Sequence, residues 1–123
     1  MSGCEWIIDA HGCDQSALRD IAHLTAVIDE IVAALSLHPV AQPVWHRFPE
    51  PGGVTGVCLL SESHVAFHTF PEFRSLCLNV FCCRPRPDMD FAACLTRTVG
   101  ASSVHVRRVD RPYRDWPFAT DTL

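Results

Sequence analysis

Short strand-like runs follow one another through the middle of the chain, with an amphipathic helical pattern before and after them. β-Branched and aromatic residues are frequent in these runs, and proline, glycine or polar residues separate them. We predict strands at residues 43–48, 54–60, 64–70 and 76–83. Because the strands are grouped instead of alternating with helices, the chain is restricted to an α+β architecture.

Two stretches carry apolar residues at the three- and four-residue spacing of a helix, one over residues 15–37 and the other over residues 88–99. Further strands are predicted at residues 4–10 and 104–109. The expected fold is therefore a two-layer α+β sandwich, with a mainly antiparallel sheet and two helices on one face.

The length of the chain, 123 residues, suits one compact domain and leaves too little core for a second. We expect a single domain over residues 1–123, with the residues from 110 onward as a tail packed on the surface. The predicted strands are apolar at both alternating sets of positions, so both sheet faces need cover. We therefore expect a homodimer that forms through the sheets.

The charged residues exclude several kinds of partner and chemistry. Fourteen acidic residues against ten basic ones give a net charge of −4, which provides no attraction for nucleic acid or an anionic membrane. All ten basic residues are arginines. Without lysine, the chain cannot hold pyridoxal phosphate as an imine, form a lysine Schiff base or build a Walker A loop.

Seven cysteines make an odd number, and no charged-then-apolar leader precedes them. A disulfide framework is therefore not expected, and we predict a protein of the reducing cytoplasm. The sequence also has no uninterrupted apolar run of the roughly 20 residues needed to span a bilayer. We expect no membrane association.

The densest group of reactive side chains lies between Ser61 and Cys83, and a metal site is the first interpretation to consider. On a strand, His64 and His68 would share a face but lie roughly 13 Å apart at about 3.3 Å per residue. The adjacent Cys82 and Cys83 would point to opposite faces. We therefore expect no metal ion.

Two other chemistries use the same group of residues. A hydrolase could use Ser63 or Cys83 as nucleophile and His68 as base, but the sequence lacks a Gly-x-Ser-x-Gly elbow. Alternatively, Ser63 could attack the carbonyl of Glu62 and cleave the chain, leaving a pyruvoyl group on residue 63. Such a ketone would form an imine with a substrate amine and accept the electrons of a departing carboxylate.

The motif Glu-Ser-His at residues 62–64, followed by His-Thr-Phe-Pro-Glu at residues 68–72, resembles the processing region of bacterial S-adenosylmethionine decarboxylases. The similarity extends over roughly residues 5–109 and is strongest at residues 46–83. It implies self-cleavage between Glu62 and Ser63 into a β chain (1–62) and an α chain (63–123). It also implies a pyruvoyl-dependent decarboxylation of S-adenosylmethionine, which supplies the aminopropyl donor for spermidine biosynthesis.

The resemblance implies a role for each matching residue. Ser63 would become the pyruvoyl group and His68 would be the processing base, next to Ser63 if the strand doubles back at the dimer centre. Thr55 would assist processing through its hydroxyl group. Cys83 would protonate the carbon that has lost carbon dioxide, while Cys82 would only pack in the core.

The resemblance also implies a substrate pocket, with Phe48 and Phe70 stacking on adenine and Glu72 binding the ribose hydroxyls. Phe70 replaces a tryptophan that is common in the family, and Asn79 and Arg84 replace its usual aspartate and glycine. These departures keep two alternatives open. The same machinery could decarboxylate ornithine or arginine, or the chain could be an unprocessed regulatory paralogue.

Overall fold

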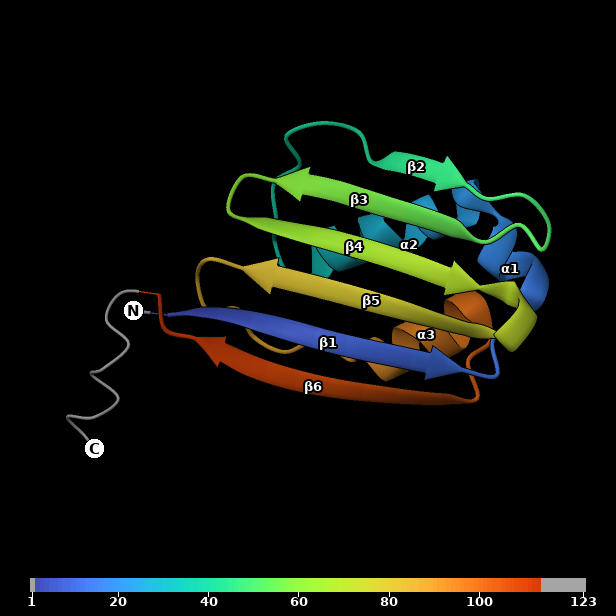
Figure 1. Ribbon diagram of the computed structural model, residues 1–123. Coiled ribbons are helices and arrows are strands. Elements are labelled where there is room, and N and C mark those ends of the chain that lie inside the picture. The colour runs from blue at the N-terminus through green and yellow to red at the C-terminus, as the bar shows by residue number, and fades with distance from the viewer. Residues whose placement is uncertain (1, 114–123) are drawn as a thin grey trace.

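The computed structural model describes residues 2–113, which form a six-stranded antiparallel sheet with the helices on one face (Figure 1). In chain order the elements are β1 (Gly3–His11), α1 (Gln15–Arg19), α2 (Ile21–Ala34), β2 (Val44–Arg47), β3 (Val54–Leu60), β4 (Ser63–Phe70), the 3-10 helix η1 (Pro71–Phe73), β5 (Ser75–Cys82), α3 (Phe91–Val99) and β6 (Ser103–Arg111). The strand order is β2-β3-β4-β5-β1-β6. The predicted α+β sandwich is confirmed.

The helices differ from the prediction in their bounds, and the first predicted helical stretch ends at Ala34 and not at residue 37. The pattern over residues 15–37 predicted one helix, but Asp20 has an extended backbone (φ −94°, ψ 99°) and separates α1 from α2. Its side chain accepts a hydrogen bond from the amide of His23 at 3.1 Å, so Asp20 caps α2. In the same way Asp90 caps α3, and the predicted start at residue 88 is wrong. Most of the predicted tail, residues 114–123, lies outside the described residues.

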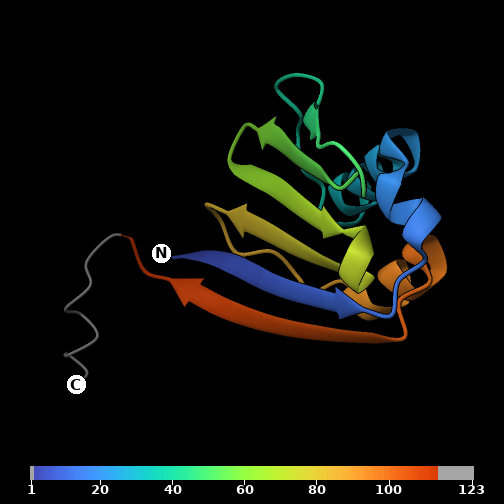
Figure 2. The same ribbon diagram turned by 45° about the vertical axis from the view of Figure 1, so that its right-hand side comes forward.

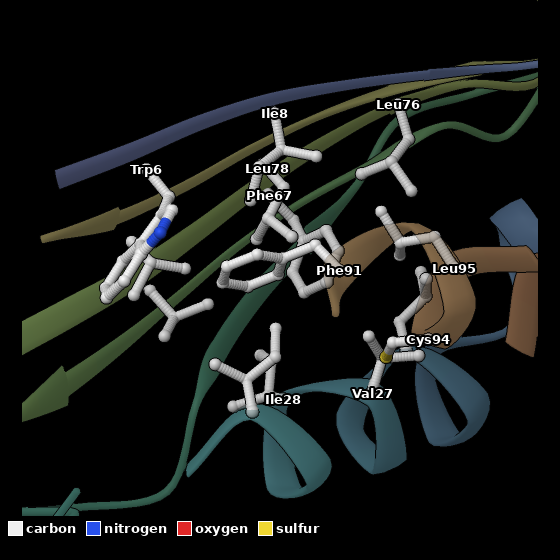
Figure 3. Close-up of a cluster of buried hydrophobic side chains, with 14 of the residues drawn as sticks. Trp6, Ile8, Val27, Ile28, Phe67, Leu76, Leu78, Phe91, Cys94 and Leu95 are labelled. Carbon is white, nitrogen blue, oxygen red and sulfur yellow. The ribbon is translucent and has the colours of Figure 1, made fainter. Parts of the chain in front are cut away.

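The core lies between the sheet and the helices because alternate strand residues point to the helical side. Figure 3 shows side chains of the sheet meeting those of α2 and α3. The labelled members are Trp6, Ile8, Phe67, Leu76 and Leu78 from the sheet, Val27 and Ile28 from α2, and Phe91, Cys94 and Leu95 from α3. All of them are at most 2% exposed.

A search of the described helices for a membrane-spanning segment finds none of sufficient length and hydropathy.

None of the helices within residues 2–113 lies on the opposite sheet face, as Figure 2 shows. Val57 and Leu59 of β3 are 45% and 58% exposed on it. The neighbouring outward positions of the sheet also carry polar side chains, among them Glu5, His64 and Asn79. This outer face is therefore more polar than the strand pattern predicted.

Truncation in the core tests how the helical layer is held. Ile28 is 1% exposed between α2 and the sheet, and Ile28→Ala should lower the free energy of unfolding by about 2–5 kcal/mol, since it leaves a cavity. Val40→Ala, at a side chain that is 60% exposed, is the control and should change it by less than about 0.5 kcal/mol. Urea denaturation measures both. Equal losses would mean that Ile28 does not carry the packing assigned to it.

Candidate active site

Ser63 begins β4, directly after the tight turn that joins it to β3 (Figure 1). Leu60 and Ser63 face each other at the end of the ladder, so Ser61 and Glu62 form the turn. Ser63 is 8% exposed, and its Oγ is buried with no hydrogen-bond partner among the described residues. An unpaired buried hydroxyl is rare in proteins, and here it belongs to the predicted nucleophile.

The carbonyl group before Ser63 is also held. The backbone amide of Cys83 donates a hydrogen bond of 2.7 Å to the oxygen of Glu62. The turn is anchored on its other side, where the amide of Ser61 donates to His38 O at 2.9 Å. A donor in this position would stabilise negative charge on the Glu62 oxygen during an attack on its carbon.

The two adjacent cysteines have different surroundings. Cys82 points into the core, is 1% exposed and faces Cys4 across the ladder, and burial raises the pKa of its thiol to about 11. Cys83 is exposed and lines a cavity of about 490 Å³ together with Ser63 and His64. The structure thus brings the predicted nucleophile and the predicted proton donor together.

His68 lies near the other end of β4 and on the outer face, with Thr55 beside it. The Thr55 hydroxyl lies 3.0 Å from Nδ1 of His68, so Nε2 is the nitrogen left to exchange a proton. The condition under which His68 would lie beside Ser63, a strand that doubles back, is not met within one chain, because β4 runs without interruption from Ser63 to Phe70. Five residues apart, the α-carbons of Ser63 and His68 are separated by roughly 16 Å, and the two side chains point to opposite faces.

A second cavity, of about 440 Å³, contains the remaining predicted residues. It is lined by Phe48, Thr55, His68, Phe70 and Glu72. Phe48 is 49% exposed and Phe70 is 37% exposed, so neither ring belongs to the core. The residues predicted to bind substrate and the predicted processing base therefore share one pocket, apart from the cavity of Ser63 and Cys83.

Two arginines fix the loop that forms one wall of this pocket. Nε of Arg19 donates to Pro51 O at 2.8 Å, and Nη1 of Arg47 donates to Gly52 O at 3.4 Å. Gly52 has a φ of +83°, which a side chain would strain. The loop also brings Glu50, a second carboxylate, to the pocket wall beside Glu72.

The cavity of Ser63 is also lined by side chains that were not predicted from the sequence, among them Glu5, Phe81 and Arg111. Arg111 donates to the carboxylate of Glu5, and its guanidinium lies over the Phe81 ring at 5.4 Å. Burial alone would raise the pKa of Glu5, but hydrogen bonds from Asn79 and Arg111 outweigh it and hold that pKa below its usual value. Only the strand register brings together residues so far apart in the chain.

The residues first considered for a metal are dispersed. His64 and His68 are both exposed on β4, whereas Cys82 is buried and Cys83 is exposed. Within residues 2–113, no group of three or more His, Cys, Asp and Glu side chains is placed to hold a metal ion.

The contact between Thr55 and His68 can be tested by a pair of substitutions. Thr55→Val removes the hydroxyl group at nearly constant shape. If His68 is the base for cleavage at Ser63, as the resemblance implies, this change should slow cleavage by up to about tenfold, the equivalent of one hydrogen bond. Thr55→Ser keeps the hydroxyl group and should cleave at close to the original rate. The appearance of the two fragments with time measures both variants. Cleavage of the valine variant at the unchanged rate would remove Thr55 from the site.

Comparison with known proteins identifies relatives over most of the chain. A family model described as S-adenosylmethionine decarboxylase matches residues 4–112. A protein of Moorella thermoacetica named S-adenosylmethionine decarboxylase proenzyme is 32% identical over 85% of this chain and 83% of its own length. A protein of the same name from Caldicellulosiruptor saccharolyticus is 33% identical over 95% of this chain and 94% of its own. The crystal structure of the adenosylmethionine decarboxylase from Aquifex aeolicus shares the fold, with a TM-score of 0.77 over 93% of each chain at 20% identity.

Proposed function

The chain belongs to the S-adenosylmethionine decarboxylase family, and from this premise we propose that it cleaves itself at Ser63 and decarboxylates S-adenosylmethionine. The enzyme is pyruvoyl-dependent, and its product is the aminopropyl donor for spermidine biosynthesis. One observation carries the assignment of the cleavage site. The Oγ of Ser63, which is buried and has no hydrogen-bond partner within residues 2–113, lies next to a carbonyl group that already accepts a hydrogen bond from the Cys83 amide.

Self-cleavage begins when Oγ of Ser63 attacks the carbonyl carbon of Glu62. The peptide C–N bond breaks, and an ester joins Glu62 to the serine side chain. A base then removes the α-proton of residue 63, and the Glu62 carboxylate leaves. The remaining dehydroalanine takes up water and loses ammonia, so that the α chain begins with a pyruvoyl group.

The residues around Ser63 fit a pyruvoyl group and its chemistry. The pyruvoyl carbonyl supplies the electron sink for a departing carboxylate, which no lysine in this chain can supply. Cys83 lines the same cavity and is exposed, so its Sγ–H can donate a proton to the carbon that has lost carbon dioxide. Cys82, buried and with a raised pKa, is assigned a packing role.

The pocket of Phe48, Phe70 and Glu72 is assigned to the adenosine part of the substrate. Its two exposed rings offer faces on which adenine can stack, and the Glu72 carboxylate can accept hydrogen bonds from the ribose hydroxyls. Glu50 and Glu72 together add negative potential, which favours a sulfonium cation. A straight-chain amino acid would leave the aromatic faces without a partner.

One chain alone holds the two parts of the site at separate places. Ser63 and Cys83 share one cavity, and His68 and the substrate pocket lie at the other end of β4 and outside that cavity. We assign the active form to a homodimer joined through the outer sheet faces, in which a two-fold axis places the pocket of one copy against the Ser63 cavity of the other. The exposed Val57 and Leu59 on this face support such an interface.

The proposed enzyme is one domain made of two chains. Residues 1–123 act together after cleavage into 1–62 and 63–123. The cleaved chains would stay together because β1 pairs with β5 and β6, and β3 pairs with β4. We place the enzyme in the cytoplasm, where its seven free cysteines remain reduced.

Two substitutions separate cleavage from catalysis. Ser63→Ala should abolish both, since no nucleophile and no pyruvoyl precursor remain. Cys83→Ala should lower the rate of decarboxylation by roughly 100-fold or more but affect cleavage far less, because alanine keeps the backbone amide that donates to Glu62. Fragment formation and release of carbon dioxide from S-adenosylmethionine are measured on each variant. Equal loss of the two activities in Cys83→Ala would contradict the proton-donor role.

Mixed dimers test whether the site is shared between copies. Neither Ser63→Ala nor His68→Ala should cleave by itself. In a hybrid dimer, one site would combine the intact Ser63 of the His68→Ala chain with the intact His68 of the Ser63→Ala chain. That His68→Ala chain should therefore be cut when the two variants are produced together, and intact mass with different tags detects it. Hybrid dimers that form without cleavage would contradict the shared site.

A further inference from the structure

A chain of hydrogen-bonded side chains crosses four strands on the outer face and ends at the residue after Ser63. Arg111 of β6 donates to Glu5 of β1, and Asn79 of β5 donates through Nδ2 to Oε2 of Glu5 at 2.6 Å. Oδ1 of Asn79 lies 3.1 Å from Nε2 of His64 on β4. We call Glu5, Asn79 and His64 the relay.

The two hydrogen bonds of the relay can run in only one direction. The Glu5 carboxylate accepts hydrogen bonds and cannot donate them, so it fixes the Asn79 amide with Nδ2 towards Glu5. Oδ1 of Asn79 then faces Nε2 of His64, and His64 must donate from that nitrogen. The relay therefore selects the His64 tautomer that carries its proton on Nε2.

Packing holds the same ring in place. The imidazole of His64 stacks on Phe81 with ring centroids 5.6 Å apart and an interplanar angle of 10°. Arg111 lies over the same Phe81 ring. Only 16% of the Glu5 side chain is exposed, so the carboxylate that orients Asn79 is itself largely buried. His64 is thus restrained by a hydrogen bond at its edge and by a ring on its face.

The restraint on His64 becomes important once the chain is cleaved. Before cleavage, Ser63 is held from the N-terminal side by the turn at Glu62. After it, residue 63 is a chain end, and chain ends fray unless they are tied down. Its ladder pairings with Leu60 and Cys82 and the hydrogen-bonded side chain of His64 are ties that remain after cleavage.

We propose that Glu5 and Asn79 are positioning residues which, through His64, hold the new terminus at residue 63 in place for decarboxylation. This inference rests on the proposed function. Neither residue touches the reacting atoms in this assignment. It also gives a reason for asparagine at residue 79, where the resemblance leads one to expect aspartate. An aspartate there would place a second carboxylate about as close to Glu5 as Nδ2 now lies, and the two charges would repel.

A substitution that places two carboxylates side by side, and a second substitution that removes one of them, test the relay. Asn79→Asp should lower kcat for S-adenosylmethionine by about tenfold or more with little change in KM, because none of the relay residues lines the pocket assigned to adenosine. In the double variant Glu5→Gln, Asn79→Asp, the introduced amide can donate to the introduced carboxylate, which still accepts from His64. Its kcat should return to within about threefold of the original value. Asp29→Asn, at an exposed position on α2, is the control for loss of a charge and should keep full activity.

A spectroscopic readout separates positioning from general damage. In ¹⁵N-histidine-labelled, cleaved enzyme, the neutral ring of His64 should carry its proton on Nε2, with its signals assigned by their loss in His64→Gln. Asn79→Leu removes the acceptor and should give a mixture of both tautomers. Unchanged tautomers in Asn79→Leu, or a double variant no more active than Asn79→Asp, would overturn the proposal. Failure of the proposed function is distinct, because the unsubstituted chain would then neither cleave nor release carbon dioxide.

Discussion

The hydrogen bond from the Cys83 amide to the Glu62 carbonyl joins the two segments on which the chemistry depends. It holds the β3–β4 turn against the end of β5, so that Ser63, Glu62 and Cys83 occupy one cavity. Because the donor belongs to the backbone, it persists whatever the side chain at residue 83 does. In the proposed reaction, one peptide group supports the cleavage step, and the thiol of the same residue serves the decarboxylation step.

Side chains alternate between the two faces of a strand, and this alternation decides which predicted site residues can meet within one chain. Ser63 and His68 are an odd number of residues apart on an uninterrupted strand, so they point to opposite faces. The helices of the described residues cover one face of the sheet (Figure 2), and the proposed homodimer uses the other. A small chain can then build a site larger than it could enclose alone, by combining two cavities from two copies.

Strand and helix patterns predicted most of the fold, because alternation and helical spacing are local properties of the sequence. The break at Asp20 was missed, since a cap inside an amphipathic stretch leaves the apolar spacing unchanged. Phe48, Phe70 and Glu72 were expected to share a pocket, and they do. The pair of Glu5 and Arg111 could not be predicted, because it depends on the register of β1 with β6 across 106 residues of chain.

Self-cleavage between Glu62 and Ser63 is the central claim, and the intact mass of the purified, unlabelled protein under denaturing conditions tests it most directly. Two fragments that meet at this bond are expected, the second of them blocked to amine sequencing by a pyruvoyl group. A single full-length chain that stays uncleaved on long incubation would contradict the claim.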